Sequence, residues 1–234
     1  MLHGPSLGIG AAIASVMIIG VFFGFNEISN EPELVVEPTP TIEQAGPPKI
    51  TMDTFLGNGS PILGDINAKV TLVEFGDYQC HFCNVYFQST EHKILQQYVE
   101  TGKVKIIFKD YTVIGQDSFE ASHGAHCANE QGLFWEYHDI LFLNWAGENN
   151  GWASQLNLLK FAEEIDLDLV QWSECMDNET HSKTIIASND DAKSLGITGT
   201  PAFFVIGQDE KVISIFGAQP YEVFERVFEE ELKK

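Results

Sequence analysis

The sequence predicts one α/β domain in which a β-sheet is covered by helices and interrupted by a long helical insertion. Three observations support this. An apolar run at 70–75 is followed by a helix-forming segment and a second apolar run at 104–108, an order that gives a right-handed parallel crossover. The pattern from 117 to 195 is helical. The chain then returns to β-structure at 202–206 and 212–216, two short apolar segments joined by a turn.

The first 48 residues are expected to lie outside this domain. No charged residue occurs from Leu7 to Phe25, and this run would span roughly 28 Å as a helix, close to a bilayer core of about 30 Å. We expect residues 1–25 to form an uncleaved membrane anchor, with a cleaved signal segment as the alternative. Residues 26–48 carry prolines and glutamates but no basic residue, so we expect an acidic, Pro-rich linker.

The folded domain is expected to occupy residues 49–234. A short β segment near Lys49 should open it, followed by a turn-rich stretch before the strand at 70–75. The helix that follows this strand is expected to break near 88–91 and to end at Gly102.

The helical insertion is expected at about 115–196. Its pattern is interrupted around Gly115, 147–151 and 166–168, where glycine or acidic residues gather. A last amphipathic helix, about 221–232, should close the domain.

Composition excludes one class of partner. The chain has 34 acidic and 13 basic residues among 234, for a formal net charge of −21, so binding to nucleic acid is not expected. Its four cysteines are Cys80, Cys83, Cys127 and Cys175, an even number that allows two disulfides.

The pair Cys80 and Cys83 carries the strongest chemical signal. It follows the first strand and opens a helix, where unpaired N–H groups and the helix dipole favour a thiolate. Such a pair performs thiol–disulfide exchange, with Cys80 as nucleophile and the more buried Cys83 as resolving thiol. Zinc is the alternative, but it needs a second ligand pair of matching spacing. Cys127 and Cys175 stand alone, far apart in the sequence.

Two further side chains near this pair are candidates for the chemistry. Glu74 lies inside the apolar run, six residues before Cys80, and burial there would raise its pKa and suit a proton acceptor for Cys83. A solvent-facing glutamate on a strand edge is the alternative. His81 could lower the pKa of Cys80 beyond what the helix dipole achieves, or could be an exposed histidine without a special role.

Three segments of the chain, read in order, resemble a known family. They are Leu63 to Cys83, Cys127 to His138 and Gly196 to Val205. Together they are similar to the DsbA-like thioredoxin family of exported thiol–disulfide oxidoreductases, over about Lys49 to the C-terminus. The resemblance implies a thioredoxin-like fold with a helical insertion, in which Glu74 takes the place of a buried acid. His81 departs from the pattern, since proline often follows the first cysteine in this family.

The resemblance also implies roles for residues outside the motif. Thr200 and Pro201 would form a cis-proline loop that faces the cysteine pair, where the Thr200 backbone could pair with an extended substrate. Cys127 and Cys175 would form a structural disulfide, with two buried free thiols as the alternative. The implied partners are cysteine-containing exported polypeptides and a membrane protein that reoxidises the active-site pair, without a cofactor.

Residues and resemblance together predict a membrane-anchored, extracytoplasmic thiol–disulfide oxidoreductase. A disulfide-forming oxidase that acts through a mixed disulfide on Cys80 is the favoured interpretation. A reductase or isomerase on the same fold, and a redox-inactive binding or chaperone module, remain alternatives. His123, His126 and Cys127 share a helical face, but a fourth ligand is not apparent, and no metal site is predicted there.

Overall fold

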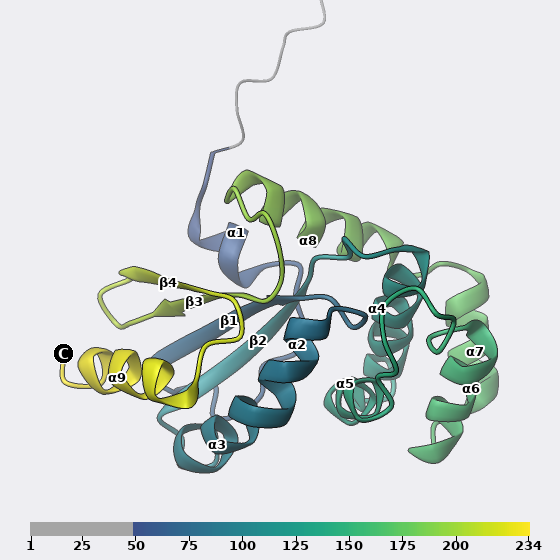
Figure 1. Cartoon of the computed structure of the whole chain (residues 1–234), viewed down its shortest axis with the longest axis horizontal. Coiled ribbons are helices and arrows are strands. Elements are labelled where there is room, and N and C mark those ends of the chain that lie inside the picture. Colours follow the sequence, from purple (N-terminus) through teal and green to yellow (C-terminus); the bar gives the residue numbers. More distant parts are fainter. Residues whose placement is uncertain (1–48) are drawn as a thin grey trace, which may run out of the picture. The chain divides into compact units, whose positions relative to one another are not determined.

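The structure is a computed structural model that describes residues 49–234 (Figure 1). The predicted anchor at 1–25 and the predicted linker at 26–48 lie outside the described residues. Within 49–234, every helix is too short or too polar to span a bilayer.

A four-stranded sheet organises the domain, with the strand order β2-β1-β3-β4. The strands are β1 (Val70–Gly76), β2 (Val104–Asp110), β3 (Ala202–Ile206) and β4 (Val212–Phe216). β1 pairs in parallel with β2 and antiparallel with β3, and β3 pairs antiparallel with β4. The predicted parallel pair and the predicted hairpin are therefore confirmed.

Side chains of β1 alternate between two covered faces. Leu72 packs in one apolar cluster with Tyr98 and Phe224, which come from the helices on that face. Val73 and Phe75 pack in another cluster with residues of α1 and α8, the helices on the opposite face (Figure 1). Because both faces are covered, all seven residues of β1 are buried. Any polar side chain in this strand is therefore buried as well.

The domain begins with a helix rather than with β-structure. The expected β segment near Lys49 is wrong, because the chain forms α1 (Met52–Leu56) there. The Thr54 hydroxyl accepts a hydrogen bond from the Thr51 N–H at 3.1 Å, which satisfies one of the donors that a helix leaves free at its start. Leu63 then makes an isolated bridge to Ile106 of β2.

The helix after β1 continues through the region where we expected a break. It consists of α2 (His81–Tyr86), η1 (Phe87–Glu91), α3 (His92–Ile94) and η2 (Leu95–Val99). The expected break at 88–91 is wrong, since η1 is a π-helical turn there. A π-helical turn widens the helix and moves the following side chains to a different face.

The insertion consists of five helices. They are α4 (Gln116–Asn129), α5 (Phe134–Leu143), α6 (Gln155–Glu164), α7 (Leu169–Asp177) and α8 (Ser182–Ser194), and α9 (Tyr221–Glu231) closes the domain. The predicted interruptions at 147–151 and 166–168 are confirmed, while those at 130–133 and 178–181 were not anticipated.

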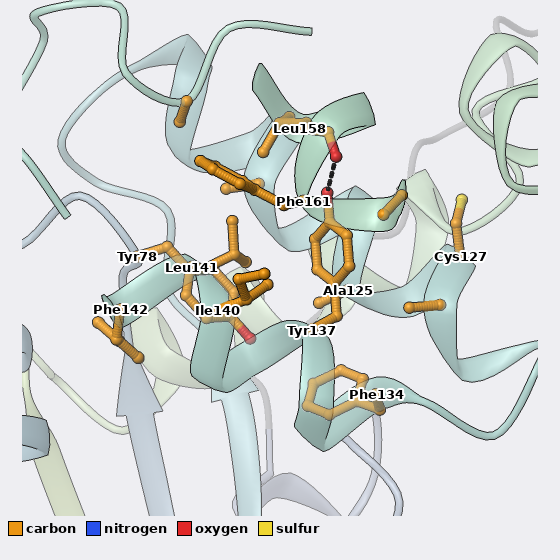
Figure 2. Close-up of a cluster of buried hydrophobic side chains, with 14 of the residues drawn as sticks. Tyr78, Ala125, Cys127, Phe134, Tyr137, Ile140, Leu141, Phe142, Leu158 and Phe161 are labelled. Carbon is orange, nitrogen blue, oxygen red and sulfur yellow. Dashed lines mark hydrogen bonds between the residues drawn. The ribbon is translucent and has the colours of Figure 1, made fainter. Parts of the chain in front are cut away.

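An apolar core joins the insertion to the sheet (Figure 2). Tyr137 of α5 is fully buried, and its hydroxyl donates to the Leu158 carbonyl of α6 at 2.8 Å. Tyr78, directly after β1, belongs to the same core and packs against Phe108 of β2, with 5.1 Å between ring centroids. This core therefore reaches the segment that precedes Cys80.

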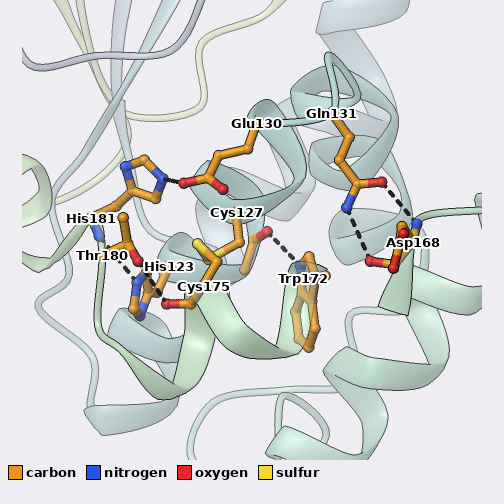
Figure 3. Close-up of a disulfide and its surroundings, with 10 residues drawn as sticks. His123, Cys127, Glu130, Gln131, Asp168, Trp172, Cys175, Thr180 and His181 are labelled. Atoms are coloured by element: carbon orange, nitrogen blue, oxygen red, sulfur yellow. Dashed lines mark hydrogen bonds and ion pairs between the residues drawn. A yellow bond between two sulfur atoms is a disulfide. The ribbon is translucent and has the colours of Figure 1, made fainter. Parts of the chain in front are cut away.

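A disulfide between Cys127 of α4 and Cys175 of α7 ties two helices of the insertion together (Figure 3). Beside it, the Trp172 indole donates to the Gly124 carbonyl at 3.0 Å. The two cysteines are 48 residues apart, so their bond removes considerable freedom from the unfolded chain.

Replacing both cysteines, as Cys127→Ala with Cys175→Ala, should lower the free energy of unfolding by about 4 kcal/mol, the loop-closure contribution of a loop of this size. Urea unfolding, followed by circular dichroism with the Cys80–Cys83 pair kept reduced in both proteins, measures the difference. An unchanged unfolding midpoint would contradict a stabilising role for this bond.

Candidate active site

The Asp77 carboxylate shapes the turn between β1 and α2. One of its oxygens accepts a hydrogen bond from the Gln79 N–H at 2.8 Å, and the other accepts from the N–H groups of Val113 and Ile114 at 2.8 and 3.0 Å. The Cys80 N–H donates to the Asp77 carbonyl at 3.0 Å. This turn places Cys80 at the N-cap of α2, the position that the sequence predicted.

The helical insertion holds the same turn from the other side. The Trp145 indole donates to the Gln79 carbonyl at 2.7 Å, and the Gln79 amide bonds both the Ser118 hydroxyl, at 3.0 Å, and the Asn149 N–H, at 2.8 Å. Gln79 is fully buried. The residue before the first cysteine is therefore held by contacts to two parts of the insertion, helix α4 and the loop between α5 and α6.

Cys80 faces the loop before β3. Its thiol donates to the Thr200 carbonyl at 3.3 Å, and the Thr200–Pro201 peptide bond is cis. The Cys80 side chain is nearly buried, with 5% exposed. The structure thus brings together Cys80, Thr200 and Pro201, which the sequence placed 120 residues apart.

The pKa of Cys80 is lowered from 9.0 to about 6. Its largest cause is a hydrogen bond from the Cys83 thiol, which outweighs the opposing effect of burial. Thr200 and the backbone N–H groups of Cys83 and Phe82 lower it further. In the fully buried Cys83, desolvation and the charge of Cys80 raise the pKa instead. At neutral pH the pair is therefore one thiolate and one thiol.

His81 is exposed at the start of α2. Its backbone N–H donates to a Glu148 carboxylate oxygen at 3.1 Å. Its imidazole ring packs against Trp145, with 5.5 Å between ring centroids. The adjacent Phe82 is 59% exposed. An influence of the His81 ring on the pKa of Cys80 remains a prediction.

Glu74 is buried in the middle of β1, with 3% of the residue exposed. β1 has a neighbouring strand on each side, and Glu74 lies opposite Phe108 of β2 and Phe203 of β3, which excludes the solvent-facing alternative. The pKa of Glu74 is raised well above its ordinary value, first by desolvation, then by the charges of Glu91 and Cys80. A carboxyl group in this environment can carry a proton at neutral pH.

The second cysteine pair cannot supply thiolate ligands in this state. Cys127 and Cys175 are bonded to each other, although one potential ligand atom of His123 lies within 4.8 Å of both sulfurs. His126 instead pairs with the Asp110 carboxylate at 2.7 Å. The sulfur chemistry that an open dithiol could perform is thus confined to Cys80 and Cys83, the free cysteines of residues 49–234.

Three buried polar residues that contact one another in a row, Tyr78, His138 and Glu91, were not identified from the sequence. The Tyr78 hydroxyl bonds His138 Nδ1 at 3.1 Å, and His138 Nε2 lies 3.8 Å from a carboxylate oxygen of Glu91. Glu91 was missed because a helix break was expected there. His138 is the last residue of the second motif segment, and its place in that segment was the only indication of it in the sequence.

Comparisons with known proteins identify the thioredoxin family. The sequence model of the thioredoxin family matches residues 57–227. Disulfide bond formation protein D of Bacillus subtilis is 29% identical over 180 residues, which are 75% of this chain and 78% of that protein.

Solved structures give the same picture. The oxidised crystal structure of Bacillus subtilis BdbD is similar with a TM-score of 0.67 and 28% identity, over 74% of this chain and 93% of that one. Wolbachia pipientis alpha-DsbA1 has a similar fold, with a TM-score of 0.67 and 24% identity over 76% and 92% of the two chains.

Replacing Cys83 tests the origin of the low thiol pKa. Cys83→Ala removes the largest contribution and should move the pKa of Cys80 upward from about 6, whereas Cys83→Ser keeps a hydroxyl donor and should leave it lower. Thiolate absorbance as a function of pH measures both, and neither variant can form the Cys80–Cys83 disulfide. Equal midpoints in the two variants would show that the hydrogen bond from residue 83 is not the main cause.

Proposed function

The chain belongs to the thioredoxin family and is a DsbA-like thiol–disulfide oxidoreductase, and from this premise we propose that it is a disulfide-forming oxidase of exported polypeptides. One observation carries the direction of the reaction. The pKa of Cys80 is lowered to about 6, which stabilises the reduced form as a thiolate, and stabilising the reduced form makes the disulfide a stronger oxidant. The name of the Bacillus subtilis relative, a disulfide bond formation protein, supports the same direction.

The proposed reaction transfers two electrons from substrate to enzyme. A substrate thiolate attacks Cys80 Sγ in the Cys80–Cys83 disulfide, which forms a mixed disulfide and releases Cys83 as a thiolate. Cys83 then takes a proton from Glu74. A second substrate thiolate attacks the substrate sulfur of the mixed disulfide, and Cys80 leaves as a thiolate. The substrate gains a disulfide and the enzyme becomes a dithiol.

We assign substrate binding to Thr200 and Pro201. When Cys80 is protonated, its thiol donates a hydrogen bond to the Thr200 carbonyl. Once Cys80 is a thiolate or part of a disulfide, it no longer donates this bond. The carbonyl can then accept from the N–H of an extended substrate, which is the recognition mode of a strand added to a free edge.

A catalytic cycle requires that the dithiol be oxidised again. We propose a membrane protein as the oxidant, since a domain tethered to the bilayer stays close to such a partner. We also propose that residues 1–25 are this anchor and residues 26–48 are the linker to the domain at 49–234. The uncharged run from Leu7 to Phe25 supports the anchor.

Equilibration with glutathione tests the direction. The Cys80–Cys83 pair should have a reduction potential well above the roughly −270 mV of thioredoxin, and the protein should oxidise a reduced, unfolded substrate in a way that Cys80→Ser abolishes. A potential near that of thioredoxin would support a reductase instead. Equal activity in wild type and Cys80→Ser would support a binding module without redox chemistry.

Membrane fractionation tests the anchor. The full chain, expressed with its own N-terminal segment, should remain in the membrane pellet after alkaline carbonate extraction, because an apolar segment of this length inserts into the bilayer. A variant with two lysines in place of Ile13 and Ile18 should be released. Release of the unaltered chain would contradict the anchor and leave the redox proposal intact.

A further inference from the structure

Two buried carboxyl groups, Glu74 of β1 and Glu91 of η1, interact electrostatically. Each residue is 3% exposed, and the charge of Glu91 contributes to the raised pKa of Glu74. Like charges in a buried site disfavour full ionisation. Glu74 therefore keeps its proton in a pH range where exposed carboxyl groups have lost theirs.

Polar atoms around Glu91 are buried without hydrogen-bond partners in the described part of the chain. They are Glu91 Oε2, His138 Nε2 and the Tyr86 hydroxyl. Buried polar atoms without partners are rare and call for an explanation. His138 is held from its other side, where Nδ1 bonds the Tyr78 hydroxyl at 3.1 Å. Its Nε2 is thus directed at the Glu91 carboxylate, 3.8 Å away.

Although buried, Glu91 borders a pocket that opens to the surface. It lines a surface pocket between η1 and α5, together with His92 and Asp139. Glu91 follows Cys80 by eleven residues of continuous helix, which places the pocket about 15 Å along the helix from the reacting sulfur. A polypeptide bound at Cys80 and Thr200 would leave this pocket open to water.

We propose that Glu91, positioned by His138, conducts protons between Glu74 and this pocket, so that Cys83 exchanges its proton with solvent while a substrate covers Cys80. The inference rests on the proposed function, because it concerns the proton that Glu74 passes to Cys83. The proton moves from the pocket to Glu91, to Glu74 and to the Cys83 thiolate when a substrate is oxidised. It follows the reverse order when the dithiol is reoxidised.

Several titratable groups face this path. Electrostatic interaction with Glu74 shifts the pKa of one of the two groups in each of its pairs with Cys80, Cys83, Tyr78 and Tyr86. The groups near Glu91 are His138, Asp139 and His92. The groups on α2 share the active site with Glu74. A variant at Glu91 is therefore the most selective way to interrupt the path without altering the sulfur atoms.

The test uses an aromatic disulfide, dithiobis(nitrobenzoate), as a probe of the full, reduced chain. Cys80 attacks the probe and releases one coloured thiolate in a first phase. Cys83 then attacks Cys80 Sγ and releases the second, and this step requires that Cys83 lose its proton. Glu91→Gln should slow the second phase by about tenfold or more, a part of the 10²–10⁴-fold that general base catalysis contributes. The first phase should keep its rate.

The pH dependence separates a proton path from a structural effect. Without the negative charge of Glu91, the pKa of Glu74 falls, so the midpoint of the second-phase profile should move to lower pH in Glu91→Gln. His138→Gln should slow the same phase, which keeps the test valid if one variant folds poorly. The matched control is Glu100→Gln, which removes an exposed carboxylate one residue after η2 and should leave both phases unchanged.

Two outcomes would overturn the inference. One is a second phase in Glu91→Gln with the rate and the midpoint of wild type, and the other is an equal slowing of both phases, which indicates a distorted Cys80. A wild-type protein that shows no second phase at all would overturn the proposed function itself.

Discussion

The hydrogen bond between the Cys83 thiol and the Cys80 sulfur is the interaction on which the rest of the site depends. It is the largest cause of the low pKa of Cys80, and together with burial it raises the pKa of Cys83. One contact therefore makes two chemically identical groups different: Cys80 becomes a thiolate, and Cys83 stays a buried thiol. The order of the reaction follows, because only Cys80 can both attack and leave as an anion at neutral pH.

This contact requires a rigid turn, and much of the fold serves to hold it. Asp77 and Gln79 fix the backbone before Cys80 with hydrogen bonds to segments that come from the insertion and the loop after β2. The insertion is in turn held by its own core and by the Cys127–Cys175 bond. The helices far from the cysteines thus contribute to catalysis by limiting movement of one turn.

The elements whose sequences are regular apolar runs were the most predictable from the sequence. The hairpin at 202–206 and 212–216 appears with the predicted bounds, because the buried strand β3 is a continuous apolar run and the less buried β4 still has apolar residues at four of its five positions. α1 was missed because five residues are too few to show helical periodicity. The network of Glu91 and His138 joins η1 to α5, and periodicity within one helix carries no information about such a tertiary contact.

The size of the pKa shift at Cys80 could not be predicted from the sequence either. A helix dipole is worth about 2 kcal/mol at most, and one pKa unit corresponds to about 1.4 kcal/mol, so the dipole explains little more than one unit. The decrease from 9.0 to about 6 needs donors that touch the sulfur. Those donors, above all the Cys83 thiol and Thr200, depend on how the side chains and the distant loop are placed.

The electrostatic coupling of Glu74 to Cys80 links proton transfer to the redox state. The thiolate of Cys80 contributes to the raised pKa of Glu74, and this contribution disappears when Cys80 is in a disulfide and carries no charge. Glu74 is therefore a stronger acid in the oxidised enzyme, at the moment when Cys83 leaves as an anion and needs a proton. After Cys80 is released as a thiolate, Glu74 becomes a stronger base, which suits the removal of a proton from Cys83 during reoxidation. The same buried carboxyl group is thus adjusted to opposite tasks by the charge of the sulfur that it serves.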